Sequence, residues 1–277
     1  MDLCSGGRPA DSFARYGAHL ARGLFPAEEV TVLLAHVREL ARTTTEFFRD
    51  GTHDPESDDP LRRWPRMIHP HLKDRTLRDL LLDDRIRRML VELLGKEPLA
   101  VQSMVYFKPP GSRGQALHQD QRYLRVSPGT CVAAWLALED CDPGNGGLRV
   151  VPGSHVVEVL CPVPSDTSQS FTPETVPVPQ GMEPVDVVMQ AGDVLFFHGK
   201  LIHGSGPNTS PDRFRTIAVG HYATADAQRI SDSYPTAYTF DGDRQSLDAD
   251  DSGGPCGVWE DGTYRRTSTV AESLAAH

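Results

Sequence analysis

Short runs of β-branched and aromatic residues separated by Pro/Gly turns fill the middle of the chain, and this pattern most restricts the possible fold. The runs are AVQSMVYFKPP, TCVAAWLALED, GGLRVVPGSH, VDVVMQAGDVLFF and FRTIAVGHY, all between residues 100 and 222. Such residues pack well on a pleated surface, and several short strands with turns between them are typical of an antiparallel sandwich or barrel. We therefore expect a mainly β fold, a double-stranded β-helix (jelly roll, cupin-like).

The first third of the chain instead shows helical periodicity. Apolar residues follow Pro26 at positions 30, 33, 34, 37 and 40, and others follow Asp83 and Asp84 at positions 86, 89, 90, 93 and 94. This is the spacing of one helix face, and Gly95 favours the end of the second helix. The polar stretch Asp50–Pro60 lacks such spacing and is expected to be a mobile loop and a candidate lid.

The organisation expected from these patterns is one domain over residues 1–277. Flanking helices should occupy about 1–95, the jelly roll about 96–225, and a C-terminal insertion and tail 226–277. The region Ala225–Gly257 is acidic and rich in Gly, which favours an insertion over one end of the sheet.

Charge and cysteine content limit the classes of partner and compartment. The net charge is −10 and no Lys/Arg-rich stripe is present, so we expect a small-molecule ligand rather than nucleic acid or a membrane. The start, MDLCSGGRPADSF, lacks the apolar core of a signal peptide, and no apolar run is long enough to span a membrane. The five cysteines are odd in number and form no C-x-x-C pair, so we expect reduced thiols and a cytoplasmic location.

Two motifs place potential metal ligands at the ends of predicted strands. ALHQDQRYL contains His118 and Asp120, and LIHGSGPN contains His203. Side chains two residues apart on an extended chain point to the same side, so His118 and Asp120 can share one ion. Two histidines and one carboxylate leave positions open for substrate and O₂, as in non-haem Fe(II) sites. An isolated H-x-D is more often a surface polar pair. His198 competes with His203, but we expect a hydrogen-bonded strand-end residue there.

A dicarboxylate cosubstrate of such an iron site needs a cation at its far end. A guanidinium does this best, through two parallel hydrogen bonds to a carboxylate. TSPDRFRTIAVGHY supplies Arg213 and Arg215. Buried charge is costly unless paired, so Arg215, which leads into an apolar strand, is expected to face an anionic ligand. Arg213 lies beside Asp212 in a turn and is expected to be solvated, although either arginine remains a candidate.

At these residues the chain resembles the phytanoyl-CoA dioxygenase family, a branch of the Fe(II)/2-oxoglutarate oxygenases. The motifs that carry the resemblance are SMVYFKPP, LHQD, AAWLALE, NGGLRVVPGSH, GDVLFFHGKLIHGSGPN and FRTIAVGHY. The resemblance implies a jelly roll with Fe(II) bound by His118, Asp120 and His203, with 2-oxoglutarate as cosubstrate and O₂ as oxidant.

The resemblance also implies a set of residues that bind 2-oxoglutarate. Arg215 and Ser205 are expected to bind its distal carboxylate. Met104 and Trp135 match positions that line the cosubstrate pocket in the family. Gln102 falls where a polar side chain can reach the same ligand.

Other polar residues near these motifs are expected to play supporting roles. A lysine that helps hold 2-oxoglutarate in the namesake enzyme is missing from RMIHPH, where Arg66, His69 or His71 can replace it or nothing does. The two histidines of this stretch are candidates for the pocket mouth. His155 and His221 are expected to be structural or to support the metal ligands.

The function implied by the resemblance is oxidation of an unactivated C–H bond of a small molecule. Related halogenases lack the carboxylate, so Asp120 favours hydroxylation-type chemistry. We expect a bacterial secondary metabolite as substrate, with an acyl-CoA as the alternative. Outside this class, the alternatives are a non-catalytic ligand-binding jelly roll and a zinc hydrolase, since the same ligands bind Zn²⁺.

Overall fold

A computed structural model describes residues 8–48, 52–234 and 236–275. Its helices are α1 (Pro9–Tyr16), α2 (Ala27–Thr43), α3 (Pro60–Arg63), η1 (Pro70–Leu72), α4 (Arg75–Leu81), α5 (Asp84–Leu94), α6 (Gln121–Leu124), η2 (Pro143–Asn145), η3 (Ser154–Val156) and α7 (Val270–Ala275). Its strands are β1 (Ala18–Ala21), β2 (Met67–Ile68), β3 (Pro98–Lys108), β4 (Gln115–His118), β5 (Val132–Ala137), β6 (Leu148–Val150), β7 (Val163–Pro164), β8 (Glu174–Thr175), β9 (Val185–Asp186), β10 (Val194–His198), β11 (His203–Ser205), β12 (Arg215–Thr224), β13 (Arg229–Ser231), β14 (Thr236–Tyr238), β15 (Arg244–Ser246), β16 (Asp248–Asp250), β17 (Pro255–Glu260) and β18 (Thr263–Thr269).

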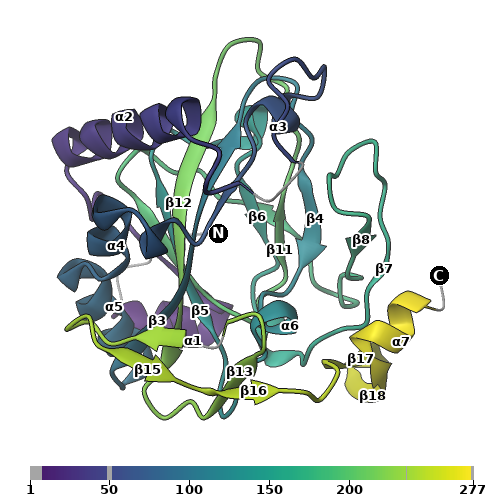
Figure 1. Ribbon diagram of the computed structural model, residues 1–277. Helices are drawn as coiled ribbons and strands as arrows, with labels where there is room; N and C mark the ends of the chain where they lie inside the picture. The colour runs from purple at the N-terminus through teal and green to yellow at the C-terminus, as the bar shows by residue number, and fades with distance from the viewer. Residues whose placement is uncertain (1–7, 49–51, 235, 276–277) are drawn as a thin grey trace.

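Two sheets face each other, and helices α2, α4 and α5 cover the outer face of the larger one (Figure 1). The larger sheet has the order β1-β10-β5-β12-β3-β14-β15, with β2 also pairing with β3, and the smaller one has the order β4-β11-β6-β9. Neighbouring strands such as β12 and β3 run antiparallel. The predicted mainly β jelly roll with flanking helices is therefore confirmed.

The central strands of the larger sheet are buried on both faces. Ala134 of β5 and Phe196 of β10 belong to the core between this sheet and the helices. Their sequence neighbours Trp135 and Phe197 belong to the core between the two sheets. Because successive side chains of a strand alternate between its faces, both faces must be apolar here. This explains why these runs read as nearly continuous apolar sequence.

The two predicted helices form where their periodicity and end signals placed them. Helix α2 begins directly after Pro26 and buries Val30 and Val37. Helix α5 is capped by Asp83, whose side chain accepts a hydrogen bond from the backbone of the first turn, and ends at Gly95 with φ of 67°. Glycine adopts this left-handed conformation without a Cβ clash. Within the described ranges, no helix is both long and apolar enough to cross a bilayer.

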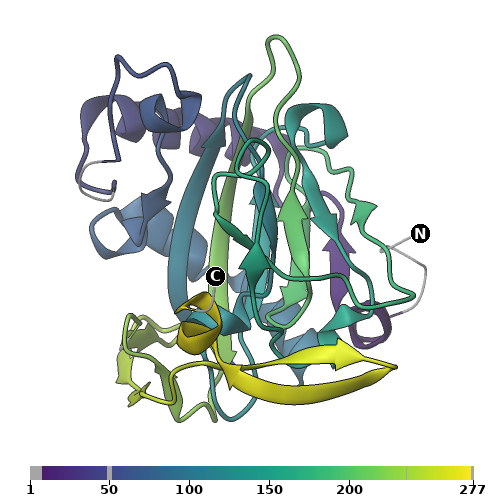
Figure 2. The same ribbon diagram turned by 90° about the vertical axis from the view of Figure 1, so that its right-hand side faces the viewer.

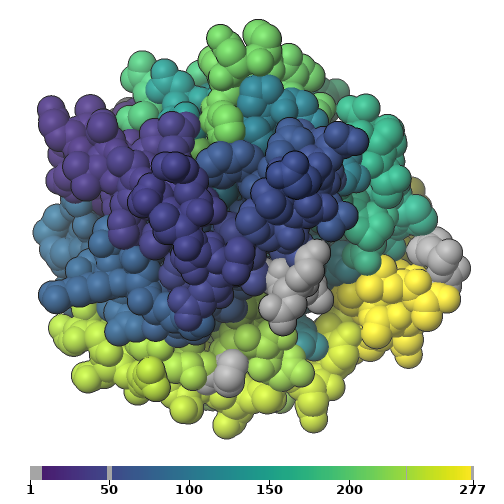
Figure 3. Space-filling view, turned by 45° about the horizontal axis from the view of Figure 1, so that its top comes forward, coloured from purple at the N-terminus to yellow at the C-terminus, as the bar shows by residue number. Residues whose placement is uncertain are grey.

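Several strands lie in regions whose sequence did not predict them. β1 and β2 fall in the predicted helical part, yet β1 pairs with β10 and β2 with β3. β14 and β15 fall in the predicted C-terminal insertion and extend the edge of the larger sheet. Strands of two to four residues are too short to show a period of two, and backbone hydrogen bonds to a neighbouring strand define them. In Figure 3 the part of the chain after β12, in lime and then yellow, forms the lower edge of the face shown.

The predicted loop Asp50–Pro60 is described only from residue 52 onward. Residues 52–59 lead into helix α3, and the side chain of Asp59 accepts a hydrogen bond from the backbone of Leu61 at 2.9 Å. A backbone hydrogen bond of 2.9 Å also joins Asp54 to the carbonyl of Arg62. The described part of the loop therefore packs back on α3, and its mobility stays a prediction.

The expectation of reduced thiols is wrong for one pair of cysteines. Cys161 and Cys256 form a disulfide with a Cα–Cα distance of 4.8 Å, and it ties the β17–β18 hairpin, yellow in Figure 2, to the loop after β6. The two residues are 95 positions apart, so their spacing in the sequence carries no sign of the pairing. Cys131 and Cys141 are buried free thiols, as expected. Cys4 lies outside the described residues.

Candidate functional site

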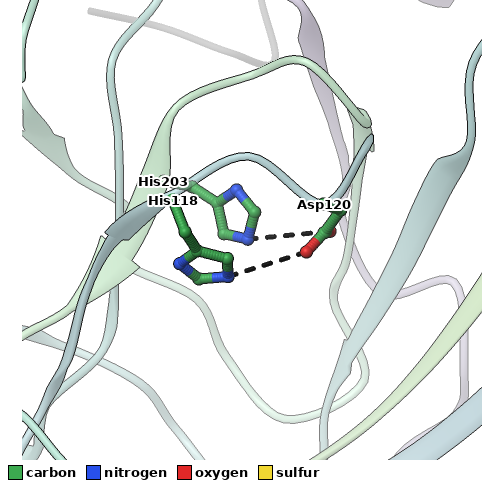
Figure 4. Close-up of side chains that lie close together, drawn as sticks. All are labelled: His118, Asp120 and His203. Atoms are coloured by element: carbon green, nitrogen blue, oxygen red, sulfur yellow. Dashed lines mark ion pairs between the residues drawn. The ribbon is translucent and has the colours of Figure 1, made fainter. Parts of the chain in front are cut away.

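The three predicted metal ligands converge at one end of the smaller sheet. His118 ends β4 and His203 begins the neighbouring strand β11, where the two residues stand directly opposite each other. Their ring centroids are 4.2 Å apart. Asp120 lies across from both rings, and its carboxylate oxygens are 3.6 Å from His118 Nε2 and 3.7 Å from His203 Nε2 (Figure 4). One ligand atom from each of the three buried residues lies within 4.8 Å of the others.

Asp120 reaches this point by a different local route from the one predicted. Its backbone is helical, with φ of −62° and ψ of −32°, because it directly precedes α6. The extended geometry assumed from the H-x-D spacing is therefore wrong, although the expected proximity to His118 holds. The chain turns after the strand ends, and the turn rather than the strand pleat directs the carboxylate.

Hydrogen bonds to the backbone set the tautomers of the two histidines. His118 Nδ1 lies 2.9 Å from the carbonyl of Ala116, and His203 Nδ1 lies 3.0 Å from that of Leu201. A carbonyl only accepts, so each Nδ1 carries the proton and each Nε2 presents a lone pair. The amide nitrogen of Gln115, 3.2 Å from His118 Nε2, donates to that lone pair. Both imidazoles are thus oriented as metal ligands usually are.

The protonation states of the cluster also suit a cation. Burial, reinforced by the neighbouring His203, lowers the pKa of His118 to about 3, so this ring is neutral at pH 7. Burial would raise the pKa of Asp120, but His203, His221 and His118 outweigh it and hold that pKa below its usual value. His221 Nε2 donates to Asp120 Oδ2 at 3.1 Å. One carboxylate oxygen is thus occupied and the other remains available.

This donor set fits a divalent transition metal. Two neutral imidazole nitrogens and one ionised carboxylate suit Fe(II), and they also bind Zn²⁺. A cavity of about 40 Å³ adjoins the three ligands, and the predicted residues Met104, Trp135, Ser205 and Arg215 line it. Its position leaves room for further ligands beside the three side chains. Tyr106, Gln115 and Leu148 also line this cavity, and the sequence did not single them out.

Arg215 is a buried cation, and no acidic side chain in the described part of the chain pairs with it. Its guanidinium donates to the carbonyl of Gly146 at 3.3 Å and lies 5.5 Å from the centre of the Trp135 ring. Burial lowers its pKa, and among the described residues no carboxylate forms an ion pair with it. Arg213 instead is exposed and forms an ion pair with Asp142 at 2.6 Å. The geometry therefore favours Arg215 as the group that meets an anionic ligand.

Lys108 is a functional candidate that the sequence reasoning missed. Its Nζ is buried beside Arg215 and donates to Ser205 Oγ at 2.7 Å and to the carbonyls of Gly146 and Gly206 at 3.2 and 2.7 Å. Ser205 Oγ also accepts from the backbone of Gln115 at 3.3 Å. Two accepted hydrogen bonds leave the serine proton free to donate into the cavity. The signal was present in SMVYFKPP, a lysine at the end of an apolar strand.

Three other candidates do not reach the cavity. The amide of Gln102 donates to the hydroxyl of Tyr234 at 3.3 Å. His71 is buried and its Nδ1 is 2.7 Å from Ser103 Oγ. The ring of His69 packs against those of His71 and Tyr234 at centroid distances of 5.9 and 5.7 Å. None of the three appears among the residues that line the cavity beside the metal ligands.

The two remaining histidine candidates, His155 and His198, have structural contacts. His198 ends β10, and its Nδ1 accepts a hydrogen bond from the backbone of Lys200 at 3.1 Å. His155 donates to the carbonyl of Ala14 at 3.1 Å. His198 is therefore a hydrogen-bonded strand-end residue, and His203 rather than His198 belongs to the metal cluster.

Comparisons with known proteins agree with this site. The model of the phytanoyl-CoA dioxygenase (PhyH) family matches residues 13–217. Phytanoyl-CoA dioxygenase 1 of Oryza sativa subsp. japonica is 33% identical over 142 residues, which are 51% of this chain and 50% of that protein. The chain thus spans about half the length of the first curated relatives that it matches.

Solved structures with the same fold include two proteins from nogalamycin biosynthesis. The epimerase SnoN, in complex with Fe³⁺, alpha ketoglutarate and nogalamycin RO, superposes with a TM-score of 0.62 and 26% identity over 79% of this chain and 83% of that chain. The non-haem alpha ketoglutarate dependent carbocyclase SnoK superposes with a TM-score of 0.60 and 25% identity over 78% and 83% of the two chains. Because the family model matches most of its length, the chain belongs to the phytanoyl-CoA dioxygenase family.

Proposed function

We propose that this protein is an Fe(II)- and 2-oxoglutarate-dependent oxygenase that oxidises an unactivated C–H bond of a small molecule. The observation that carries the proposal is one cavity with two complementary walls. One wall holds His118, Asp120 and His203 with their ligand atoms within 4.8 Å of one another. The other holds the guanidinium of Arg215, which has no carboxylate partner among the residues that the structure describes. A metal would bind the three ligands of the first wall, and a dicarboxylate would pair with the guanidinium of the second.

In this proposal His118 Nε2, His203 Nε2 and one oxygen of Asp120 bind the iron. The hydrogen bonds at both Nδ1 atoms orient the rings so that each Nε2 faces the metal position, and His221 holds the second oxygen of Asp120. Bound Fe(II) with 2-oxoglutarate supplies the activation of O₂ that oxidises the substrate C–H bond. The buried surroundings exclude water from this reaction.

Arg215 and Ser205 would bind the distal carboxylate of 2-oxoglutarate. Arg215 offers the charge, and Ser205 offers the O–H that its two accepted hydrogen bonds direct into the cavity. Trp135 packs over the guanidinium and Met104 forms part of the same wall. Gln102 would not contact the cosubstrate, because its amide donates a hydrogen bond to the hydroxyl of Tyr234 instead.

For the substrate we favour an intermediate of a specialised natural product. The support is that SnoN and SnoK, both from nogalamycin biosynthesis, cover most of this chain. SnoN is an epimerase and SnoK a carbocyclase, so hydroxylation, epimerisation and ring closure are all outcomes within this proposal. An acyl-CoA substrate is the second candidate, favoured by the names of the phytanoyl-CoA dioxygenase relatives.

Anaerobic spectroscopy tests the proposal directly. Protein mixed with Fe(II) and 2-oxoglutarate under argon should develop a visible metal-to-ligand charge-transfer band, and His203→Ala should lose it. Admission of O₂ should then release succinate. A ligand-binding jelly roll would release none, and a zinc hydrolase would turn over without O₂. Absence of the band from correctly folded wild-type protein would remove the proposed function.

We also propose a single domain over residues 1–277 that acts on a small molecule, and the sequence predicts a cytoplasmic location that remains to be tested. The net charge of −10 supports the absence of a nucleic-acid partner. The disulfide between Cys161 and Cys256 opposes a cytoplasmic location, because disulfides persist mainly in oxidising compartments. Alkylation of free thiols in cells quenched with acid, followed by mass spectrometry, decides the compartment question. Limited proteolysis that yields one resistant core would support the single domain.

A further inference from the structure

The cavity beside the metal ligands is too small for a natural-product substrate. It measures about 40 Å³, whereas pockets for drug-sized ligands measure roughly 300–1,000 Å³. A second chamber of about 380 Å³ lies next to it and has the required size. Tyr106 lines both spaces, so the two approach each other at this side chain. A molecule in the larger chamber can therefore contact Tyr106, which also lines the cavity of the metal ligands.

The charge of this chamber is opposite to that of the whole chain. Arg62, Arg66 and Arg113 line it against the single carboxylate of Asp59. The guanidinium of Arg62 is paired with Asp54 at 3.6 Å, and that of Arg113 with Asp59 at 2.8 Å. In a protein with a net charge of −10, a cationic chamber selects for an anionic ligand.

Arg66 is the arginine of this chamber that lacks an acidic partner among the described residues. It is half-buried, and its Nη1 lies 3.4 Å from the hydroxyl of Tyr106. Its guanidinium carbon lies 5.8 Å from the centre of the Tyr106 ring and 5.9 Å from that of Phe171. The two aromatic rings hold the side chain in place without neutralising it. A carboxylate or phosphate of a ligand can accept the hydrogen bonds that remain.

The rest of the wall is apolar. Leu61, Pro65, Ile68, Phe107 and Phe171 all face the chamber. A ligand that satisfies both features has a hydrophobic or aromatic body and one anionic group. An ammonium group would meet three guanidinium groups and no unpaired carboxylate, so a cationic ligand is disfavoured.

We infer that this chamber is the substrate site, and that the substrate is an organic anion whose carboxylate or phosphate binds Arg66. The assignment of this ligand as the substrate rests on the proposed function. Binding of an anion in the chamber does not itself require iron. Arg66 lies next to Tyr106, which also lines the metal cavity. An anionic group bound to Arg66 would therefore set the distance between the rest of the ligand and the metal ligands. Arg66 would thereby act as a specificity-determining residue.

Binding of matched probes to the full-length, metal-free protein tests the inference. The probes are 2-naphthoate, the neutral isostere naphthalene-2-carboxamide, and coenzyme A as a phosphate-bearing probe. Isothermal titration calorimetry would give their dissociation constants. We expect 2-naphthoate to bind about tenfold or more tightly than the amide, and Arg66→Gln to abolish this difference. Arg66→Lys should restore part of it, which separates loss of charge from loss of fold.

Arg75→Gln provides the control, because Arg75 is 93% exposed and lies outside the chamber. This variant should keep the wild-type preference. Tighter binding of coenzyme A than of naphthoate, lost in Arg66→Gln, would support the anion site and identify a phosphate-bearing substrate. Equal affinity for the acid and the amide would overturn the inference.

A cosubstrate titration separates this inference from the proposed function. The affinity for 2-oxoglutarate, followed by the charge-transfer band under argon, should be the same in Arg66→Gln as in wild type. A weakened cosubstrate with unchanged naphthoate binding would assign Arg66 to 2-oxoglutarate and overturn the substrate site. If wild-type protein binds naphthoate but shows no charge-transfer band, the oxygenase proposal is contradicted and the anion site is still supported.

Discussion

Lys108 Nζ lies 2.7 Å from Ser205 Oγ, and the two side chains come from different sheets. The lysine is 2% exposed and forms no ion pair with a carboxylate among the described residues. Together with Arg215 it places two buried basic groups side by side, and burial, followed by the charge of Arg215, lowers the pKa of Lys108. Such an arrangement is costly unless an anion binds there.

Replacing Lys108 by Met should weaken 2-oxoglutarate binding. The substitution leaves Ser205 without the hydrogen bond that orients its hydroxyl and removes a basic group beside Arg215. We expect a rise of about tenfold in the dissociation constant, measured by anaerobic titration of the charge-transfer band. Lys96→Met, which removes an exposed lysine paired with Asp226, is the matched control. Unchanged affinity in a folded Lys108→Met protein would show that the lysine is only structural.

Arg215→Met should abolish cosubstrate binding, and Arg213→Gln should not. Truncating one partner of a buried charge pair typically costs several kcal/mol, so we expect a loss of affinity of about 100-fold or more. Arg213 is exposed and paired with Asp142, so its removal should leave the affinity close to wild type. The same titration measures both variants. The reverse order of effects would transfer the cosubstrate role to Arg213.

His221→Phe should weaken iron binding without removing a ligand. His221 donates to Asp120 Oδ2 at 3.1 Å, and this bond holds the carboxylate in its orientation. Loss of such supporting hydrogen bonds typically costs about 10–100-fold in metal affinity. Competition with a chelator gives the affinity for Fe(II), and His221→Asn tests partial rescue because its amide can still donate. Wild-type metal affinity in His221→Phe would contradict the supporting role.

The metal-free protein should lose stability as the pH falls from 7 towards 4. Burial, followed by His155 and Lys200, lowers the pKa of His198 to about 3, against 6.5 for the unperturbed group. Between these values the unfolded chain binds more protons than the folded one, so the free energy of unfolding decreases as the pH decreases. At pH 5 the contribution is at most about 2 kcal/mol.

His198→Asn should reduce this pH dependence. Asparagine does not titrate, and its oxygen can still accept the hydrogen bond from the backbone of Lys200. Urea unfolding of the wild type and the variant at pH 7 and pH 5 measures the difference. Equal losses of stability in both proteins would mean that other groups dominate the acid response.

The Cys161–Cys256 disulfide should stabilise the C-terminal hairpin against unfolding. It closes a loop over a sequence separation of 95, and crosslinks of long loops typically contribute roughly 2–4 kcal/mol. Cys256→Ser should lower the free energy of unfolding by about that amount under oxidising conditions. Reduction of the wild type with dithiothreitol should produce the same loss and have no further effect on the variant. A variant as stable as the oxidised wild type would contradict this role.

Several features of the protein were readable from the order of its residues. The jelly roll followed from short apolar runs between Pro/Gly turns, and helices α2 and α5 from their periodicity and end residues. These signals are local, since strand and helix periods repeat within one element. His118, His203 and Arg215 could be named because histidine binds metals, arginine binds carboxylates, and each of these residues lies at the end of a predicted strand. Their chemistry limits what such positions can do.

Tertiary structure alone decided how these residues are supported. The contacts of Ser205 with Lys108, of Asp120 with His221, and of the two disulfide cysteines join positions 97, 101 and 95 apart. Which distant side chains meet depends on strand register and sheet packing, and no local pattern records it. The same holds for the choice of Arg215 over Arg213, which their surroundings decide. Residue types thus limited the chemistry, and the fold selected which of them act together.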